Sequence, residues 1–210
     1  MLRLNIIQPL TLYLQKKLNL TQDEKEIASY GLQVLVYSVT GLLSILLTGW
    51  LLGCFWTTLT AVVSAGFLRV VSGGAHSRSP LTCNLLGIVV GVSLGKTAAI
   101  AGNHISQYPL LVIITIGFVV SFFTVWRLAP VDSPAKPISS PEKRRQLRLR
   151  ALAVLCSITA AQFLLLAYGQ AASIILAASM GLWWQAFTLT RTGHWFATFM
   201  DNFKERGWTG

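Results

Sequence analysis

No charged residue lies between Glu26 and Arg69. This uncharged stretch is too long for a single crossing of a bilayer, because one crossing needs about 20 apolar residues. Gly49 and Gly53, on either side of Trp50, provide a tight turn at a membrane interface. The stretch therefore predicts two consecutive membrane spans joined by a short turn.

The composition agrees with a membrane protein. Of the 210 residues, 53% are hydrophobic and 11% are charged, and the mean hydropathy is +0.60. A water-soluble domain would struggle to keep so much apolar surface away from solvent. The net charge of +10 would suggest nucleic acid in a soluble protein, but here the basic residues separate apolar runs. We therefore expect one polytopic domain over residues 1–210 and no nucleic-acid partner.

Later apolar runs bring the expected number of membrane-spanning helices to six. Ser79-Pro80 places an N-cap residue and a first-turn proline before the third span. The fold class is accordingly an all-α integral membrane protein. The expected spans are 27–52, 55–71, 81–101, 108–126, 151–168 and 171–189.

The N-terminal segment, residues 1–20, predicts an amphipathic helix on the membrane surface, with apolar residues at steps of four. A soluble-type helix docked on the bundle is an equally good interpretation. Thr21 and Glu24 form a capping-box pattern, so a second helix should begin near Gln22. The apolar residues at this spacing are Ile6, Leu10, Leu14 and Leu18.

Positive charge is distributed unequally between the two sides of the six-span topology. Sixteen of the seventeen lysines and arginines fall on the side of the termini, and Lys96 falls toward the other. By the positive-inside rule, both termini and the segment 69–83 are expected in the cytoplasm, with the chain embedded in membrane lipids.

The segment 69–83 is a polar, glycine-bearing island that carries His76 and Cys83, seven residues apart. Cys83 would lie in the first turns of the third span, where free amides and the helix dipole favour a thiolate. His76, on a loop that Gly73 and Gly74 make mobile, is a candidate for the base that takes the sulfur's proton. These are the ingredients of a cysteine peptidase.

Other interpretations of the island remain open. A structural histidine in a loop and a packed cysteine at a helix start would give the same pattern. Arg69 is suited to three roles: stabilising the thiolate, positioning a substrate carboxylate, or anchoring at lipid headgroups. Asn84 and Asp132 are candidates to orient the histidine, but no third catalytic residue is assigned.

Neither a metal nor another cofactor is predicted. No third or fourth ligand lies near His76 and Cys83 in the sequence. Cys54 and Cys156 lie in apolar stretches and are expected to be small packing residues.

The pattern Arg-x-x-x-Gly-Gly-x-His-x6-Cys, running from Arg69 to Cys83, resembles the signature of the accessory gene regulator B family, the membrane endopeptidases of peptide quorum sensing. A second block, Ala129-Pro130-Val-Asp-Ser-Pro-Ala-Lys-Pro-Ile138 followed by the basic run 143–150, resembles the cytoplasmic loop of that family. Size, span number and loop order also agree, so the resemblance covers most of the chain.

The resemblance implies that Cys83 is the nucleophile and His76 its base and acid, supported by Arg69, Gly73 and Gly74. The implied substrate is a short membrane-associated (AgrD-like) propeptide, whose C-terminal tail is removed to leave a thioester on the enzyme. A cysteine of the propeptide then attacks this thioester and closes a thiolactone ring, in the plasma membrane of a bacterium. A homodimer would also be in keeping with the resemblance.

The loop 129–150 suggests how an acidic peptide tail would be bound. Residues 136–150 contain six cations and one anion, Glu142. Alternatively, these charges only fix the topology and contact anionic lipid. The candidate substrate-binding residues are Lys136, Lys143, Arg144 and Arg145.

The competing hypothesis is a non-enzymatic membrane protein, such as a small transporter or a peptide-export partner. The expected spans contain few ionisable residues, and no internal repeat is evident. Gln162 and Gln185 would either line a path or make interhelical hydrogen bonds. Both sequence features argue against transport.

Overall fold

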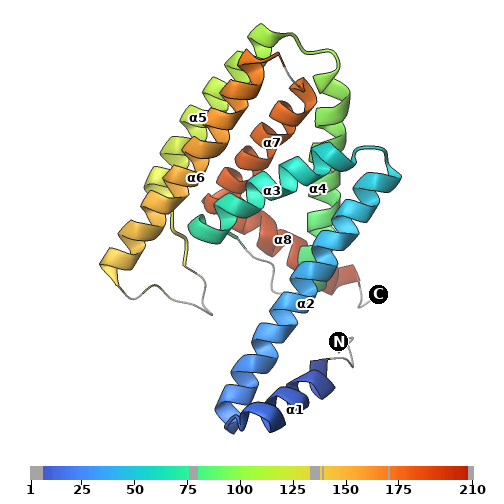
Figure 1. Cartoon of the computed structure of the whole chain (residues 1–210), viewed down its shortest axis with the longest axis vertical. Coiled ribbons are helices and arrows are strands. Elements are labelled where there is room, and N and C mark those ends of the chain that lie inside the picture. The colour runs from blue at the N-terminus through green and yellow to red at the C-terminus, as the bar shows by residue number, and fades with distance from the viewer. Residues whose placement is uncertain (1–6, 76–79, 133–137, 139, 170, 208–210) are drawn as a thin grey trace. The chain divides into compact units, whose positions relative to one another are not determined.

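The computed structural model describes residues 7–75, 80–132, 138, 140–169 and 171–207 (Figure 1). His76 and Lys136 therefore lie outside the described residues. All regular structure in the described part of the chain is helical, and six of its helices are long and apolar enough to cross a membrane. The predicted all-α membrane architecture is confirmed.

The chain divides into two compact parts, Met1–Ser44 and Ile45–Gly210. The first contains α1 (Ile7–Leu18) and the start of α2 (Gln22–Leu51), which runs on into the second. The capping box that was expected before α2 is present. The Thr21 amide donates to Glu24 Oε2 at 2.9 Å, and the Glu24 amide donates to Thr21 Oγ1 at 3.4 Å.

The second part is a bundle arranged around one central helix. α7 packs against α3, α4, α5, α6 and α8. In its most apolar stretch 61% of the residues are buried, against at most 33% in the other candidate spans. α7 is thus enclosed by protein, while its neighbours turn one face outward. The helices besides α2 are α3 (Phe55–Ser72), α4 (Pro80–Gly102), α5 (Gln107–Leu128), α6 (Pro141–Ala167), α7 (Ala172–Leu189) and α8 (Arg191–Gly207).

Small residues bring α3 close to α4 and α7. A Cβ added at Gly181 would overlap the Ala61 carbonyl, and one added at Gly95 would overlap the Thr58 backbone. Such close approach between helices is common in membrane bundles, where packing rather than water exclusion drives association. It fixes α3, which carries Arg69, against the central helix.

The bundle has two ends, a site end and a far end. At the site end α3, α5 and α7 finish and α4 and α6 begin; at the far end the opposite holds. Each end has its own apolar core. Leu68, Leu155 and Leu189 belong to the core nearer the site end, and Leu110, Ile114 and Ile175 to the core nearer the far end.

Two element boundaries differ from the sequence prediction. α6 begins at Pro141, ten residues before the span expected from hydropathy, so residues 141–150 are helical. Ser140 is its N-cap, with Oγ accepting from the Lys143 amide at 3.5 Å, and Pro141 occupies the first helical position. The C-terminal segment, for which no helix was predicted, contains α8.

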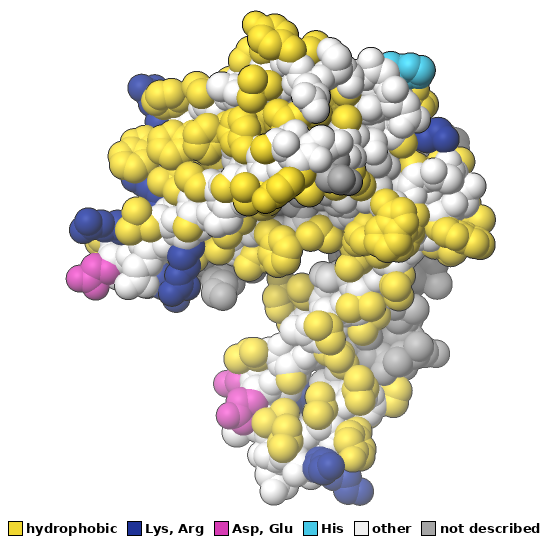
Figure 2. Space-filling view, turned by 45° about the horizontal axis from the view of Figure 1, so that its top comes forward, with side chains coloured by type: hydrophobic (Ala, Val, Ile, Leu, Met, Phe, Trp, Pro, Cys, Tyr) yellow, Lys and Arg dark blue, Asp and Glu magenta, His cyan; other side chains and the backbone are white. Residues whose placement is uncertain are grey.

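The outward faces of the bundle are apolar. Large hydrophobic side chains are exposed on every candidate span, among them Phe67, Val89 and Phe123. Figure 2 shows hydrophobic side chains spread over the visible face, with lysines and arginines near its margins. A surface of this composition is suited to lipid rather than water.

Candidate active site

The site begins where α3 ends in a glycine turn. The Gly73 amide donates to the Arg69 carbonyl at 2.9 Å, which closes the last turn of the helix. Gly73 has φ +69° and Gly74 has φ +140°, values that favour glycine because it lacks a Cβ. The two glycines therefore reverse the chain immediately before Ala75, the last described residue ahead of His76.

Arg69 lies in the last turn of α3 and is turned toward protein. Its Nη1 donates to Gln185 Oε1 of α7 at 3.3 Å, and its Nη2 donates to the Ala75 carbonyl. These bonds join the end of one span, the middle of the glycine loop and the central helix. Of the three roles that the sequence left open for Arg69, headgroup anchoring is the least compatible with these partners.

The loop after α3 is held by further bonds to α7. The Ala75 amide donates to the Thr188 carbonyl at 2.9 Å, and the Gly73 carbonyl accepts from Gln185 Nε2 at 2.7 Å. A side chain at Gly74 would crowd Thr188 Oγ1. Residues 73–75 are thus fixed in place, although the sequence suggested a mobile loop; residues 76–79 are not described.

The second block of the sequence lies directly against this loop. The Val131 amide donates to the Ser72 carbonyl at 2.9 Å, and a Cβ at Gly73 would overlap the Val131 carbonyl oxygen. Glycine is therefore favoured at position 73 for two reasons: the backbone is left-handed there, and the Val131 carbonyl comes too close for a Cβ. The described parts of the two blocks that carry the family resemblance, 69–75 and 129–132, are thus in direct contact.

Two arginines of α6 hold the second block in place. Arg148 Nε donates to the Ala129 carbonyl at 2.9 Å. Arg144 donates to the Pro130 carbonyl at 3.3 Å and forms a salt bridge with Asp132 at 2.5 Å. Both arginines are partly buried, so the helical basic run has an inward pair, four residues apart, facing the segment 129–132.

The other described cations of this run face outward. Lys143, Arg145 and Arg150 are exposed. Of the predicted substrate-binding residues, Lys143 and Arg145 are therefore open to a ligand, whereas Arg144 is engaged by Asp132. Asp132, one of the candidates for orienting the histidine, has this arginine as its ion-pair partner.

Cys83 lies in the first turn of α4 and is partly exposed. It is close enough to Arg69 for electrostatic interaction between the thiolate and the guanidinium. A helix start and a guanidinium both favour the thiolate form of a cysteine. The structure thus brings together four of the five predicted core residues of the site: Arg69, Gly73, Gly74 and Cys83.

The main residue that sequence reasoning did not place in the site is Gln185. Its position within an apolar helix was the available signal, since polar side chains in spans are usually paired or functional. Ser72, Thr188 and Arg148 were also missed, because the residues that they contact are distant in the sequence. Among the described residues, no three His, Cys, Asp or Glu side chains are grouped so that they could hold a metal ion.

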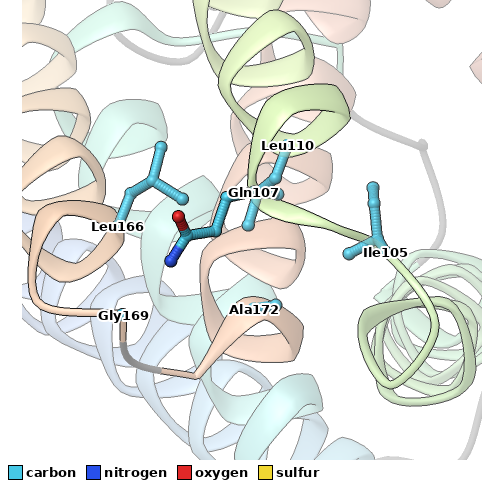
Figure 3. A pocket seen from close by; sticks show the side chains of 6 residues that line it. All are labelled: Ile105, Gln107, Leu110, Leu166, Gly169 and Ala172. Atoms are coloured by element: carbon cyan, nitrogen blue, oxygen red, sulfur yellow. The ribbon is translucent and has the colours of Figure 1, made fainter.

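A small hollow lies at the far end of the bundle, away from Cys83 and Arg69. Ile105, Leu110, Leu166, Gly169 and Ala172 line it, and Gln107 extends into it (Figure 3). The described residues that line it carry no ionisable side chain.

These features define a class: a polytopic helical membrane protein with a partly exposed cysteine at a helix start, within electrostatic range of an inward-facing arginine. The model of the accessory gene regulator B family matches residues 7–189. The chain belongs to that family. Membership supports involvement in accessory gene regulator quorum sensing and suggests a peptidase-like role.

Several curated relatives are similar over nearly the whole chain. An AgrB-like protein of Clostridium perfringens strain SM101 is 30% identical over 199 residues, which cover 90% of this chain and 92% of that protein. AgrB-like protein 2 of C. perfringens strain 13 is 30% identical over 209 residues, or 96% and 98% of the two chains. No solved structure matches the chain.

Proposed function

We propose that this protein is a cysteine endopeptidase that removes the C-terminal tail of a short, membrane-associated signalling propeptide and cyclises the remainder. The observation that carries the proposal is the position of Cys83, at the start of α4 and within electrostatic range of Arg69, in a member of this family.

In the first step Cys83 Sγ attacks the carbonyl carbon of the scissile peptide bond. His76 takes the thiol proton and delivers it to the amine of the departing tail. The C–N bond breaks, and the N-terminal part of the propeptide remains on Cys83 as a thioester. Amides at the start of α4, where Pro80 cannot donate, would stabilise the oxyanion.

In the second step a cysteine thiol of the bound propeptide attacks the thioester carbonyl. Its proton passes through His76 to the Cys83 sulfur, which leaves, and the product is a cyclic thiolactone. One thioester is exchanged for another, so the step requires no ATP. Exclusion of water by surrounding protein and lipid would favour ring closure over hydrolysis.

The exposed basic side chains suggest which substrate tail is chosen. Lys143 and Arg145 face outward near the start of α6, and they would offer positive charge to an acidic peptide tail. The positive-inside rule places these side chains and the site on the cytoplasmic face of the bacterial plasma membrane.

The test is to express the chain with a candidate propeptide and follow the product by mass spectrometry. We expect Cys83→Ala and His76→Ala to abolish tail removal. Cys156→Ala is the matched control, because Cys156 is an exposed cysteine on a different helix, α6. This variant should process the propeptide normally. Tail removal by Cys83→Ala would show that the nucleophile is wrong.

These basic side chains have their own test. The double variant Lys143→Glu/Arg145→Glu reverses two outward charges without touching the Arg144–Asp132 ion pair. We expect a raised KM for an acidic-tailed propeptide and an unchanged rate at saturation. Arg150→Glu, also exposed, is the control for reversing a charge elsewhere in the basic run. Equal KM values in all three proteins would remove the docking role.

A further inference from the structure

Gln185 is the most fully engaged polar side chain at the site end among the described residues. It is 1% exposed. Its Nε2 donates to Ser72 Oγ at 3.0 Å and to the Gly73 carbonyl at 2.7 Å. Its Oε1 accepts from Arg69 at 3.3 Å. Thr188 Oγ1 lies 3.2 Å from Oε1, but its single proton is shared with the Gln185 backbone carbonyl at 2.8 Å. Both donor hydrogens of the amide are therefore used, and its oxygen accepts from Arg69.

The charge of this side chain is as relevant as its bonds. The acceptors that Arg69 uses, the Gln185 amide oxygen and the Ala75 carbonyl, are both neutral. A carboxylate in place of the amide would hold the guanidinium equally well but would offset its positive charge. The neutral amide leaves that charge free to act on the thiolate of Cys83.

Resting on the proposed function, we propose that Gln185 is a positioning residue of the active site, which holds Arg69 in its orientation without neutralising its charge and fixes the Gly73–Gly74 turn. It would act on the chemistry through Arg69 and contact neither the substrate nor the reacting sulfur. A purely structural glutamine would stabilise the bundle but leave the reactivity of Cys83 unchanged.

Among the described side chains, the helices packed on α4 carry few ionisable residues besides Arg69. Arg69 is the one ionisable residue of α3, and α7 contains none. α8 also contacts α4, and the ionisable residues among its described side chains are the exposed Arg191 and His194 and the buried Asp201. Asp201 is the same in all variants of position 185. A difference between these variants in the pH dependence of Cys83 alkylation is therefore caused by the residue at position 185.

The chain contains a matched control for a buried glutamine. Gln162 of α6 is 2% exposed, and its Nε2 donates to the Ile175 carbonyl at 3.1 Å and to Ser179 Oγ at 2.8 Å. It therefore has the same residue type, burial and pair of donor bonds to a neighbouring helix. Its partners, Ile175 and Ser179, precede Gln185 on α7, and neither of them is bonded to Arg69.

The experiment measures the alkylation rate of Cys83 against pH in the full-length protein in lipid nanodiscs, with each cysteine resolved by peptide mass spectrometry. We expect Gln185→Glu to move the midpoint of the Cys83 profile upward by about one pH unit, because neutralising an adjacent cation removes thiolate stabilisation. Gln162→Glu should leave it in place. An unmoved profile in Gln185→Glu, or equal shifts in both variants, would overturn the proposal.

A second variant covers the case in which Gln185→Glu does not fold. Arg69→Gln should itself raise the midpoint, and Gln185→Met should raise it in wild type but not in the Arg69→Gln background. Equal effects of Gln185→Met in both backgrounds would show that Gln185 does not act through Arg69. No propeptide is needed for these measurements, so their outcome is separate from the processing test of Cys83→Ala.

Discussion

The two ends of the bundle are closed in different ways. At the far end, backbone bonds between near neighbours make the turns: the Cys54 amide donates to the Gly49 carbonyl at 2.8 Å, and the Ile105 amide to the Ala101 carbonyl at 3.1 Å. At the site end, side chains separated by more than a hundred residues are joined, as in the bond from Arg69 to Gln185. A far-end turn only has to reverse the chain, whereas the site end must fix the positions of particular groups.

A pair of glycines tests this contrast most strongly. Gly53 and Gly73 have nearly the same backbone conformation, φ +67° and +69°, but only Gly73 has a neighbour where a Cβ would stand. Gly53→Ala should cost only the left-handed strain, about 1–2 kcal/mol. Gly73→Ala adds an overlap with the Val131 carbonyl, so propeptide processing should be lost.

Thermal unfolding in detergent, together with product mass, would compare these two variants. Equal activities for Gly53→Ala and Gly73→Ala would show that the close approach to Val131 has no part in the site.

A second comparison sets Arg69 against Lys96. Lys96 donates one bond, to the Leu52 carbonyl at 2.9 Å, at an exposed far-end position. Its replacement by glutamine should change the free energy of unfolding by no more than about 0.5 kcal/mol. Arg69→Lys loses the fork that reaches Gln185 and Ala75 together, and we expect processing to fall at least tenfold in a single-turnover assay. Full activity of Arg69→Lys would mean that charge alone suffices.

The third comparison lies within the basic run of α6. Arg148→Gln removes the bond to the Ala129 carbonyl, a charge-assisted interaction worth roughly 1.5–3 kcal/mol, and should both lower thermal stability and slow processing. Arg150→Gln removes an exposed cation two residues away and should do neither. If the two variants behave alike, the inward position of Arg148 has no importance.

The smallest effect is expected for the Arg144–Asp132 ion pair, whose side chains are each 41% exposed. An exposed pair typically contributes about 0.2–1 kcal/mol. A double-mutant cycle with Arg144→Gln and Asp132→Asn, read by chemical unfolding, should give a coupling energy in that range. A coupling well above it would indicate that the pair is more than a surface contact.

The sequence predicted the spans well because their signal is local. The gap in charge before Arg69, the Thr21–Glu24 box and the Ser79-Pro80 pair each involve neighbouring residues. The start of α6 was missed, although Ser140-Pro141 has the same order of N-cap residue and first-turn proline as Ser79-Pro80. The span was placed by hydropathy, and the charged residues up to Arg150 lie outside the apolar run. α8 was missed because its apolar side is too narrow to read as a span.

The site was only partly predictable, for a different physical reason. Residue types and spacing, together with the family resemblance, named Arg69, Gly73, Gly74 and Cys83. They did not reveal Gln185 as the partner of Arg69, since a hydrogen bond between α3 and α7 depends on how the helices pack. Nor did they show that Arg144 and Arg148 face the segment 129–132, because the helix that orients them was not expected.

The contact between Ser72, Gly73 and Val131 has a consequence for how such proteins vary. Because one backbone bond and one bare glycine join the two blocks, neither block can change shape without the other. In chimeras between relatives, exchanging residues 69–83 alone should give an inactive protein more often than exchanging them together with 129–132. The unit that evolution can transfer intact is the pair of loops.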